Sequence, residues 1–82
     1  MKKENANKNL YKCADLCLAG VLTLWFPVVN LDNTIPQKVL FCFEDSSELR
    51  NILKMFWSDN LQVEPKSYFQ SIKLLKSRIY QE

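Results

Sequence analysis

The sequence predicts a small α+β domain in which a helix is followed by a β-hairpin and two further helices (α-β-β-α-α). The first reason is size, because a chain of 82 residues has room for one hydrophobic core. The second is composition, since 48% apolar residues with one glycine and three prolines are typical of a globular protein. The third is periodicity, which changes along the chain from the helical to the strand pattern and back. We expect this single domain to span residues 11–82, after a flexible basic tail over residues 1–10.

The first predicted helix runs from about Ala14 to Trp25, where nearly every residue is apolar. Asp15 lies in its first turn, where the helix dipole favours an anion, and Pro27 ends the helix. In the middle of a helix, Gly20 costs about 1 kcal/mol relative to alanine. We therefore expect Gly20 to mark a close approach by another element.

Two β segments are expected next, because the stretches VVNLD and KVLFCF are joined by the turn-forming stretch NTIPQ. The second strand is apolar on both faces. Its alternate residues are Val39, Phe41 and Phe43 on one side and Lys38, Leu40 and Cys42 on the other. One face can pack against the helices of this chain, and the other needs a cover. A second copy of the chain is a natural cover, so the sequence predicts a possible homodimer through the hairpin.

A second helix is expected to start at EDSSEL, with Asp45 as its N-cap and Glu48 three residues later. Its apolar stripe consists of Leu49, Ile52, Leu53, Phe56 and Trp57. Glu64 and Pro65 begin the third helix, with proline in its favoured first position. The buried stripe of that helix is predicted to be Tyr68, Phe69, Ile72, Leu75 and Ile79. Together these elements predict a core of Leu16, Leu22, Phe41, Phe43, Leu49, Ile52, Leu53, Phe56, Phe69, Ile72 and Leu75.

Three stretches between residues 11 and 80 carry a family resemblance. They are YKCADLCLAGVLTLWF, KVLFCFEDSSELRNILKMFW and VEPKSYFQSIKLLKSRIY. They resemble an uncharacterised family of small domains of unknown function, found mainly in bacteria, archaea and their mobile elements. The family pattern has a hydroxyl N-cap at the position of Cys13 and a glycine at that of Trp25, so the first helix is expected to be less well capped here. The resemblance implies a standalone intracellular domain and brings no catalytic residues with it.

The cysteines and the apolar run near the N-terminus bear on where the protein acts. The three cysteines are Cys13, Cys17 and Cys42. An odd number fits a reduced compartment better than a disulfide framework, so we expect a cytoplasmic protein. A secretory signal is the alternative, because MKK precedes LCLAGVLTLWF, but Asp15 and the lack of an A-x-A-like cleavage site count against it. Pro27 and Asn30 make the run too short to span a membrane, and no membrane partner is expected.

The sequence offers little for catalysis. It has no histidine, which is the usual general base and the commonest metal ligand. A structural zinc site needs four ligands, so buried structural thiols are the preferred interpretation of the cysteines. Glu44, Asp45 and Glu48 are interpreted either as a carboxylate cluster for Mg²⁺ or as helix-capping residues, and capping is favoured. We therefore expect no enzyme activity, no catalytic residue, no metal and no cofactor.

Charge is distributed unevenly along the chain. The net charge of +2 divides into +3 over residues 1–12, −4 over residues 13–64 and +3 over residues 65–82. Two basic ends therefore flank an acidic centre. Such an asymmetry favours a polyanionic partner such as nucleic acid.

The third helix carries the candidate site. At about 100° per residue, one narrow stripe consists of Lys66, Gln70, Lys73 and Ser77, with Lys76 on its shoulder. Arg78 lies away from the stripe. A solvated helix face has a similar pattern, which is the plainer interpretation. In favour of phosphate binding, serine and glutamine donors accompany the lysines, and residues 1–12 add four more lysines. Tyr80 and Tyr11 are available either to stack on bases or to pack.

Two functions from different classes follow. The first is a small non-catalytic nucleic-acid-binding accessory protein that contacts the phosphate backbone through the third helix and the tail. The alternative is a protein-interaction module, an inhibitor or an adaptor, whose partner covers the apolar hairpin face. A ribbon-helix-helix regulator has a similar order of elements, but neither face of KVLFCF can read base edges well. Helix-turn-helix fits poorly because about seven residues separate the last two helices, so any contacts are expected to the backbone of the nucleic acid.

Overall fold

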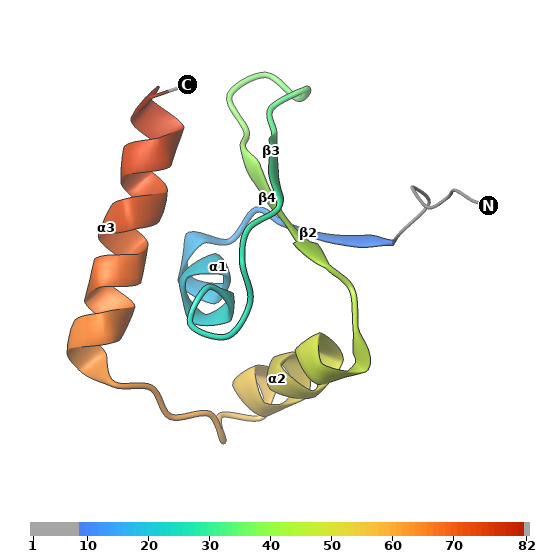
Figure 1. Cartoon of the computed structure of the whole chain (residues 1–82), viewed down its shortest axis with the longest axis vertical. Coiled ribbons are helices and arrows are strands. Elements are labelled where there is room, and N and C mark those ends of the chain that lie inside the picture. Colours follow the sequence, from blue (N-terminus) through green and yellow to red (C-terminus); the bar gives the residue numbers. More distant parts are fainter. Residues whose placement is uncertain (1–8, 82) are drawn as a thin grey trace.

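The computed structural model describes residues 9–81. In chain order its elements are β2 (Leu10–Cys13), α1 (Leu16–Leu22), β3 (Asn30–Asp32), β4 (Leu40–Glu44), α2 (Ser47–Trp57) and α3 (Pro65–Gln81). The predicted α+β class is confirmed, and so is the order of a helix, a strand pair and two helices. Figure 1 shows α1 between α3 on one side and the sheet on the other, with α2 beyond the end of β4.

The sheet has a third strand, β2, which the sequence analysis did not predict. The strand order is β2-β4-β3, and both pairings of β4 are antiparallel. Leu10, which the sequence analysis assigned to the tail, is the first residue of this strand, and Tyr11 lies opposite Phe43. The other expected tail residues, up to residue 8, lie outside the described part of the chain. Because both edges of β4 are paired, β4 cannot form the two-stranded ribbon of a ribbon-helix-helix dimer.

The face of the sheet that meets the helices forms the centre of the core. Phe41 and Phe43 of β4 point into it and are at most 1% exposed, as predicted. The buried core cluster consists of Cys13, Leu18, Ala19, Leu22, Phe41, Phe43, Leu49 and Leu75. Half-buried side chains that pack against this cluster include Leu16, Ile52, Leu53 and Phe56. The predicted core is wrong at Phe69, whose position is described with the candidate site.

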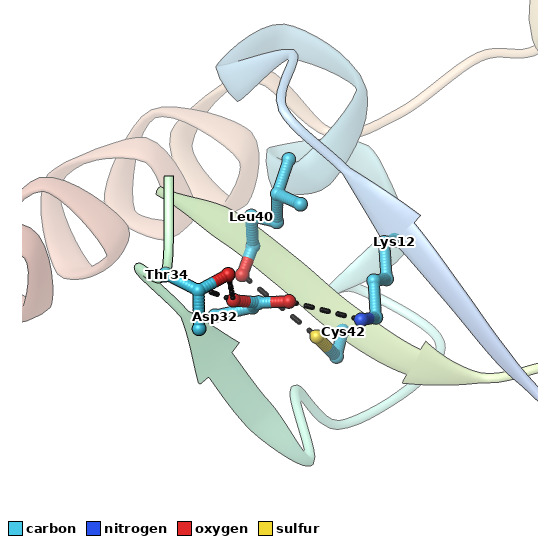
Figure 2. A network of polar contacts seen from close by, with 5 residues as sticks. All are labelled: Lys12, Asp32, Thr34, Leu40 and Cys42. Carbon is cyan, nitrogen blue, oxygen red and sulfur yellow. Dashed lines mark hydrogen bonds and ion pairs between the residues drawn. The ribbon is translucent and has the colours of Figure 1, made fainter. Parts of the chain in front are cut away.

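The opposite face of the sheet differs from the prediction. Cys42 does not belong to an exposed apolar strip, because it is fully buried, and Leu40 is half-buried. Lys12 of β2 and Asp32 of β3 lie on either side of β4 and form an ion pair, with 2.9 Å between Nζ and Oδ2. Figure 2 shows this pair reaching across β4 beside Cys42. Thr34 donates to the other carboxylate oxygen of Asp32 at 2.8 Å.

This polar cover lowers the pKa of Asp32 and removes the basis of the predicted dimer. The pKa of Asp32 is lowered to about 2, first because Lys12 donates a hydrogen bond to its carboxylate and next because Thr34 does. The homodimer was predicted from an exposed apolar strip on the hairpin. That strip is covered within one chain, so the argument for the dimer no longer holds and the dimer itself stays an untested prediction.

The start of α1 and its contact with α3 are both set by single residues. Asp15 is the N-cap of α1, and its Oδ1 accepts a hydrogen bond from the backbone N–H of Cys17 at 2.9 Å. The helix therefore has a side-chain cap without a hydroxyl at position 13. Gly20 marks a close approach, as predicted, because a Cβ there would lie 2.5 Å from Cδ1 of Ile72 and 3.2 Å from Cε1 of Tyr68.

The N-terminus of α2 uses a different cap from the predicted one. Ser46 is the N-cap, and its Oγ accepts from the backbone N–H of Leu49 at 3.0 Å. Asp45, the predicted cap, instead binds the Arg50 guanidinium, with 3.0 Å from Nε to Oδ1 and 2.6 Å from Nη2 to Oδ2. Serine and aspartate are equally good caps in isolation, and here the carboxylate of Asp45 is engaged by Arg50.

The C-terminus of α2 ends in a Schellman motif. The backbone N–H of Asn60 donates to the carbonyl of Met55 at 2.9 Å, and that of Asp59 donates to the carbonyl of Phe56 at 3.2 Å. Asp59 has a φ of 62°, a left-handed conformation that glycine usually supplies. Residues 58–64 then connect α2 to α3, and this link is longer than the turn of a helix-turn-helix.

Candidate nucleic-acid interface

The candidate site lies on α3, whose first turn is fixed by Glu64 and Pro65. Pro65 is the first residue of the helix, as predicted. The carboxylate of Glu64 accepts a hydrogen bond from the backbone N–H of Ser67 at 2.7 Å. Hydrogen bonds from the backbone of Ser67 and of Lys66 lower the pKa of Glu64. The helix therefore starts with a charged cap that remains ionised at neutral pH.

The inner side of α3 packs on α1 and sets how the helix is rotated. Leu75 is 2% exposed, and Ile72 meets Gly20 of α1. The hydroxyl of Tyr68 donates to the carbonyl oxygen and the Sγ of Cys17, at 3.1 Å in each case. Burial and the contact with Cys17 raise the pKa of Tyr68 to about 12. These contacts direct the opposite side of α3 to solvent.

All five predicted site residues lie on that outer side. They are Lys66, Gln70, Lys73, Lys76 and Ser77, and each is exposed. We call them the basic face of α3. One helix therefore brings the predicted site residues together on a single surface, and their spacing alone was sufficient to identify it.

The positive charge of α3 is not neutralised within the described structure. Its sequence from residue 65 to residue 81 contains four cations and no acidic residue. Among residues 9–81 the ion pairs are Lys12–Asp32 and Arg50–Asp45, which lie on the sheet and at the start of α2. Lys66 also lies in the first turn, where the helix dipole disfavours a cation.

Two aromatic side chains of α3 lie among the lysines. The sequence analysis expected Phe69 in the core and left Tyr80 open between stacking on bases and packing. Phe69 was predicted to be buried but is 61% exposed, and Tyr80 is 83% exposed. The ammonium of Lys73 lies 5.5 Å from the centre of the Phe69 ring, within the usual range of a cation–π contact. Tyr11, the other tyrosine considered for base stacking, packs against the core, and burial raises its pKa.

Residues 8–81 match the model of a family described as a domain of unknown function, DUF5659. The chain belongs to this family. The resemblance found in the sequence is thereby confirmed, over nearly the same residues. No curated protein and no solved structure is significantly similar to the chain.

The cysteines and carboxylates of this DUF5659 domain are dispersed. Cys13 and Cys42 are buried, whereas Cys17 is exposed at the contact with α3. Burial raises the pKa of the Cys13 and Cys42 thiols. Within residues 9–81, no three cysteine, aspartate or glutamate side chains gather closely enough to hold a metal ion. In the same part of the chain, no helix has the length and apolar character needed to cross a bilayer.

A second exposed feature of the DUF5659 domain lies at the C-terminal end of α2. Trp57 was predicted to belong to an apolar stripe, but its side chain is 66% exposed, with its ring against the edge of Phe56. An open depression of about 670 Å³ is lined by Arg50, Leu53, Lys54, Trp57 and Ser58. The sequence could not distinguish this tryptophan from the buried members of its helix, because its spacing is that of the apolar stripe.

Proposed function

We propose that this domain is a small non-catalytic nucleic-acid-binding accessory protein of the cytoplasm. The basic face of α3 holds the phosphate backbone, and the lysines of the N-terminal tail add to the attraction. The observation that carries the proposal is the unneutralised charge of α3, a helix with four cations, no acidic residue and no ion pair within the described residues.

The lysines of α3 are not placed to stabilise the helix, whereas Arg78 in the last turn is. Lys66 opposes the helix dipole, and Lys73 and Lys76, three residues apart, repel each other across one turn. A helix face that is only solvated usually mixes acidic and basic residues, which relieves such repulsion. Phosphate groups supply the missing negative charge, and their binding releases counterions from the nucleic acid.

The proposal is tested by the salt dependence of binding to a short DNA duplex, measured by fluorescence anisotropy. If three lysines each neutralise one phosphate, the slope of log affinity against log salt concentration is about −2.7. Replacing Lys73 and Lys76 by glutamine should bring it to about −0.9. The matched control replaces two exposed lysines elsewhere, Lys38 and Lys54, by glutamine and removes the same charge.

The control should leave the slope nearly unchanged, and both double variants should keep the stability of the parent, because solvated positions contribute within about 0.5 kcal/mol each. Equal effects of the two double variants would show that binding follows net charge and not the basic face of α3. No binding by the parent at low salt would refute the proposal.

The second candidate function is a protein-interaction module, for which we propose a surface on α2 in place of the hairpin. On the hairpin face expected to meet a partner, Cys42 is buried and the ion pair of Lys12 and Asp32 crosses the strand beside it. Trp57 on α2 favours this candidate instead, because it is exposed beside Leu53 and two basic side chains. Arg50 is already paired with Asp45, so the ammonium of Lys54 is the charge that suits an acidic segment of a partner protein. If the parent fails to bind nucleic acid at low salt, this candidate becomes the better account.

A further inference from the structure

We propose that the basic face of α3 prefers single-stranded nucleic acid, because Phe69 and Tyr80 stack on unpaired bases while the neighbouring lysines hold the phosphates. This inference rests on the proposed function, since it names the class of nucleic acid that the same surface takes. Its basis is the placement and exposure of the two rings.

The rings and the lysines alternate along one line of the helix. Lys66, Phe69, Lys73, Lys76 and Tyr80 follow one another at intervals of three, four, three and four residues. Residues with this spacing share one face of a helix. At a rise of about 1.5 Å per residue, the line is roughly 21 Å long and its two rings are roughly 16 Å apart. The rings can therefore contact two separate bases of one strand, with cations beside each.

The core does not require these two rings. The inner side of α3 is already formed by Tyr68, Ile72, Leu75 and Ile79, which also follow one another at helical intervals. Phe69 and Tyr80 are 61% and 83% exposed, so most of their apolar surface remains in water. Large apolar side chains exposed next to unneutralised cations are typical of a binding surface.

The contact between Lys73 and Phe69 places a group that can bind phosphate beside a ring that can stack on a base. The ammonium lies 5.5 Å from the ring centre, so a phosphate-binding group is held beside a stacking platform. Surfaces that bind single strands combine these two elements, a basic track for the backbone and aromatic rings for the bases. In a duplex the base faces are stacked on one another, so the rings gain nothing and the lysines alone contribute.

The test compares a short oligothymidylate with a blunt duplex of the same length over the same series of salt concentrations, by fluorescence anisotropy. The parent should bind the single strand more tightly than the duplex. Replacing Phe69 and Tyr80 by leucine keeps apolar character and helix propensity but removes the rings. Each ring should account for roughly fivefold or more in affinity for the single strand, so the double variant should lose at least about 25-fold.

The same double variant should bind the duplex as the parent does and should keep the salt slope, because its lysines are unchanged. The matched control is Leu74→Ala, since Leu74 is 65% exposed on a different side of α3. This control should bind both probes as the parent does.

Three results would overturn the inference, and they differ in what they say about the proposed function. If the parent binds both probes with equal affinity and replacing Phe69 and Tyr80 by leucine leaves that affinity unchanged, the stacking is rejected. Salt-dependent phosphate binding then remains in place. If Leu74→Ala loses as much affinity for the single strand as the double variant at Phe69 and Tyr80, the loss is a nonspecific effect of surface changes on α3. No salt-dependent binding to either probe would reject the proposed function together with the inference.

Discussion

Replacing Gly20 by alanine tests the contact that sets the rotation of α3. The added Cβ would lie 2.5 Å from Cδ1 of Ile72 and 3.2 Å from Cε1 of Tyr68. Overpacking of this kind costs about 1–3 kcal/mol, while alanine returns about 1 kcal/mol of helix propensity. We expect a net destabilisation of about 1 kcal/mol, which lowers the melting temperature by about 4–8 °C in a domain of this size.

The assay is urea unfolding of four proteins, namely the parent, Gly20→Ala, Ile72→Val and the double variant. Ile72→Val removes Cδ1, the atom closest to the new methyl group, so alanine at position 20 should cost less in that background. The coupling energy between the two changes should be about 1 kcal/mol. If Gly20→Ala stabilises the domain in both backgrounds, the end of the Ile72 side chain moves aside at little cost, and overpacking does not explain the glycine at position 20.

Three further predictions concern other parts of the fold. The pKa of Asp32 is about 2 in the folded protein and near 3.8 in the unfolded chain, so its contribution to stability is complete above about pH 4 and is lost as the pH falls through 2. Asp32→Asn should flatten the dependence of the melting temperature on pH in that window. A thiol reagent should modify Cys17 in the native protein much faster than Cys13 or Cys42, and mass spectrometry should find all three modified only after unfolding. Asp59→Gly should raise the stability by up to about 1 kcal/mol, because Asp59 has a left-handed backbone conformation, and calorimetry will measure the change.

The predicted order of elements depended on local signals, and these were sufficient. Pro65 at the first position of α3, the turn between β3 and β4, and the helical spacing around Leu49 can each be recognised within a few residues. The basic face of α3 was found in the same way, because residues on one side of a helix follow from its period alone. What the period does not give is where the buried stripe ends. Phe69 lies at its edge, and only the packing of Ile72 on Gly20 decides that the ring points outward.

The third strand and the covered hairpin face could not be predicted for a non-local reason. β2 has four residues, and its alternation of Leu10, Tyr11, Lys12 and Cys13 is too short to be distinguished from a loop beside a polar tail. Its partner, β4, lies some thirty residues later in the chain. The cover over Cys42 depends on that pairing, because it places Lys12 within reach of Asp32. An apolar pattern in one strand therefore shows that a cover is needed, and the pairing shows what the cover is.

The shortness and the central position of α1 have a consequence for how the domain folds. The helix has seven residues, about two turns, and lies between α3 and the sheet. A helix this short is not stable alone in water, so α1 depends on its packing against α3, β2 and α2. Folding should therefore be a single cooperative transition, and no fragment without α3 should be stable. A polyanion that binds α3 would then raise the melting temperature of the whole domain, including a sheet that it never touches.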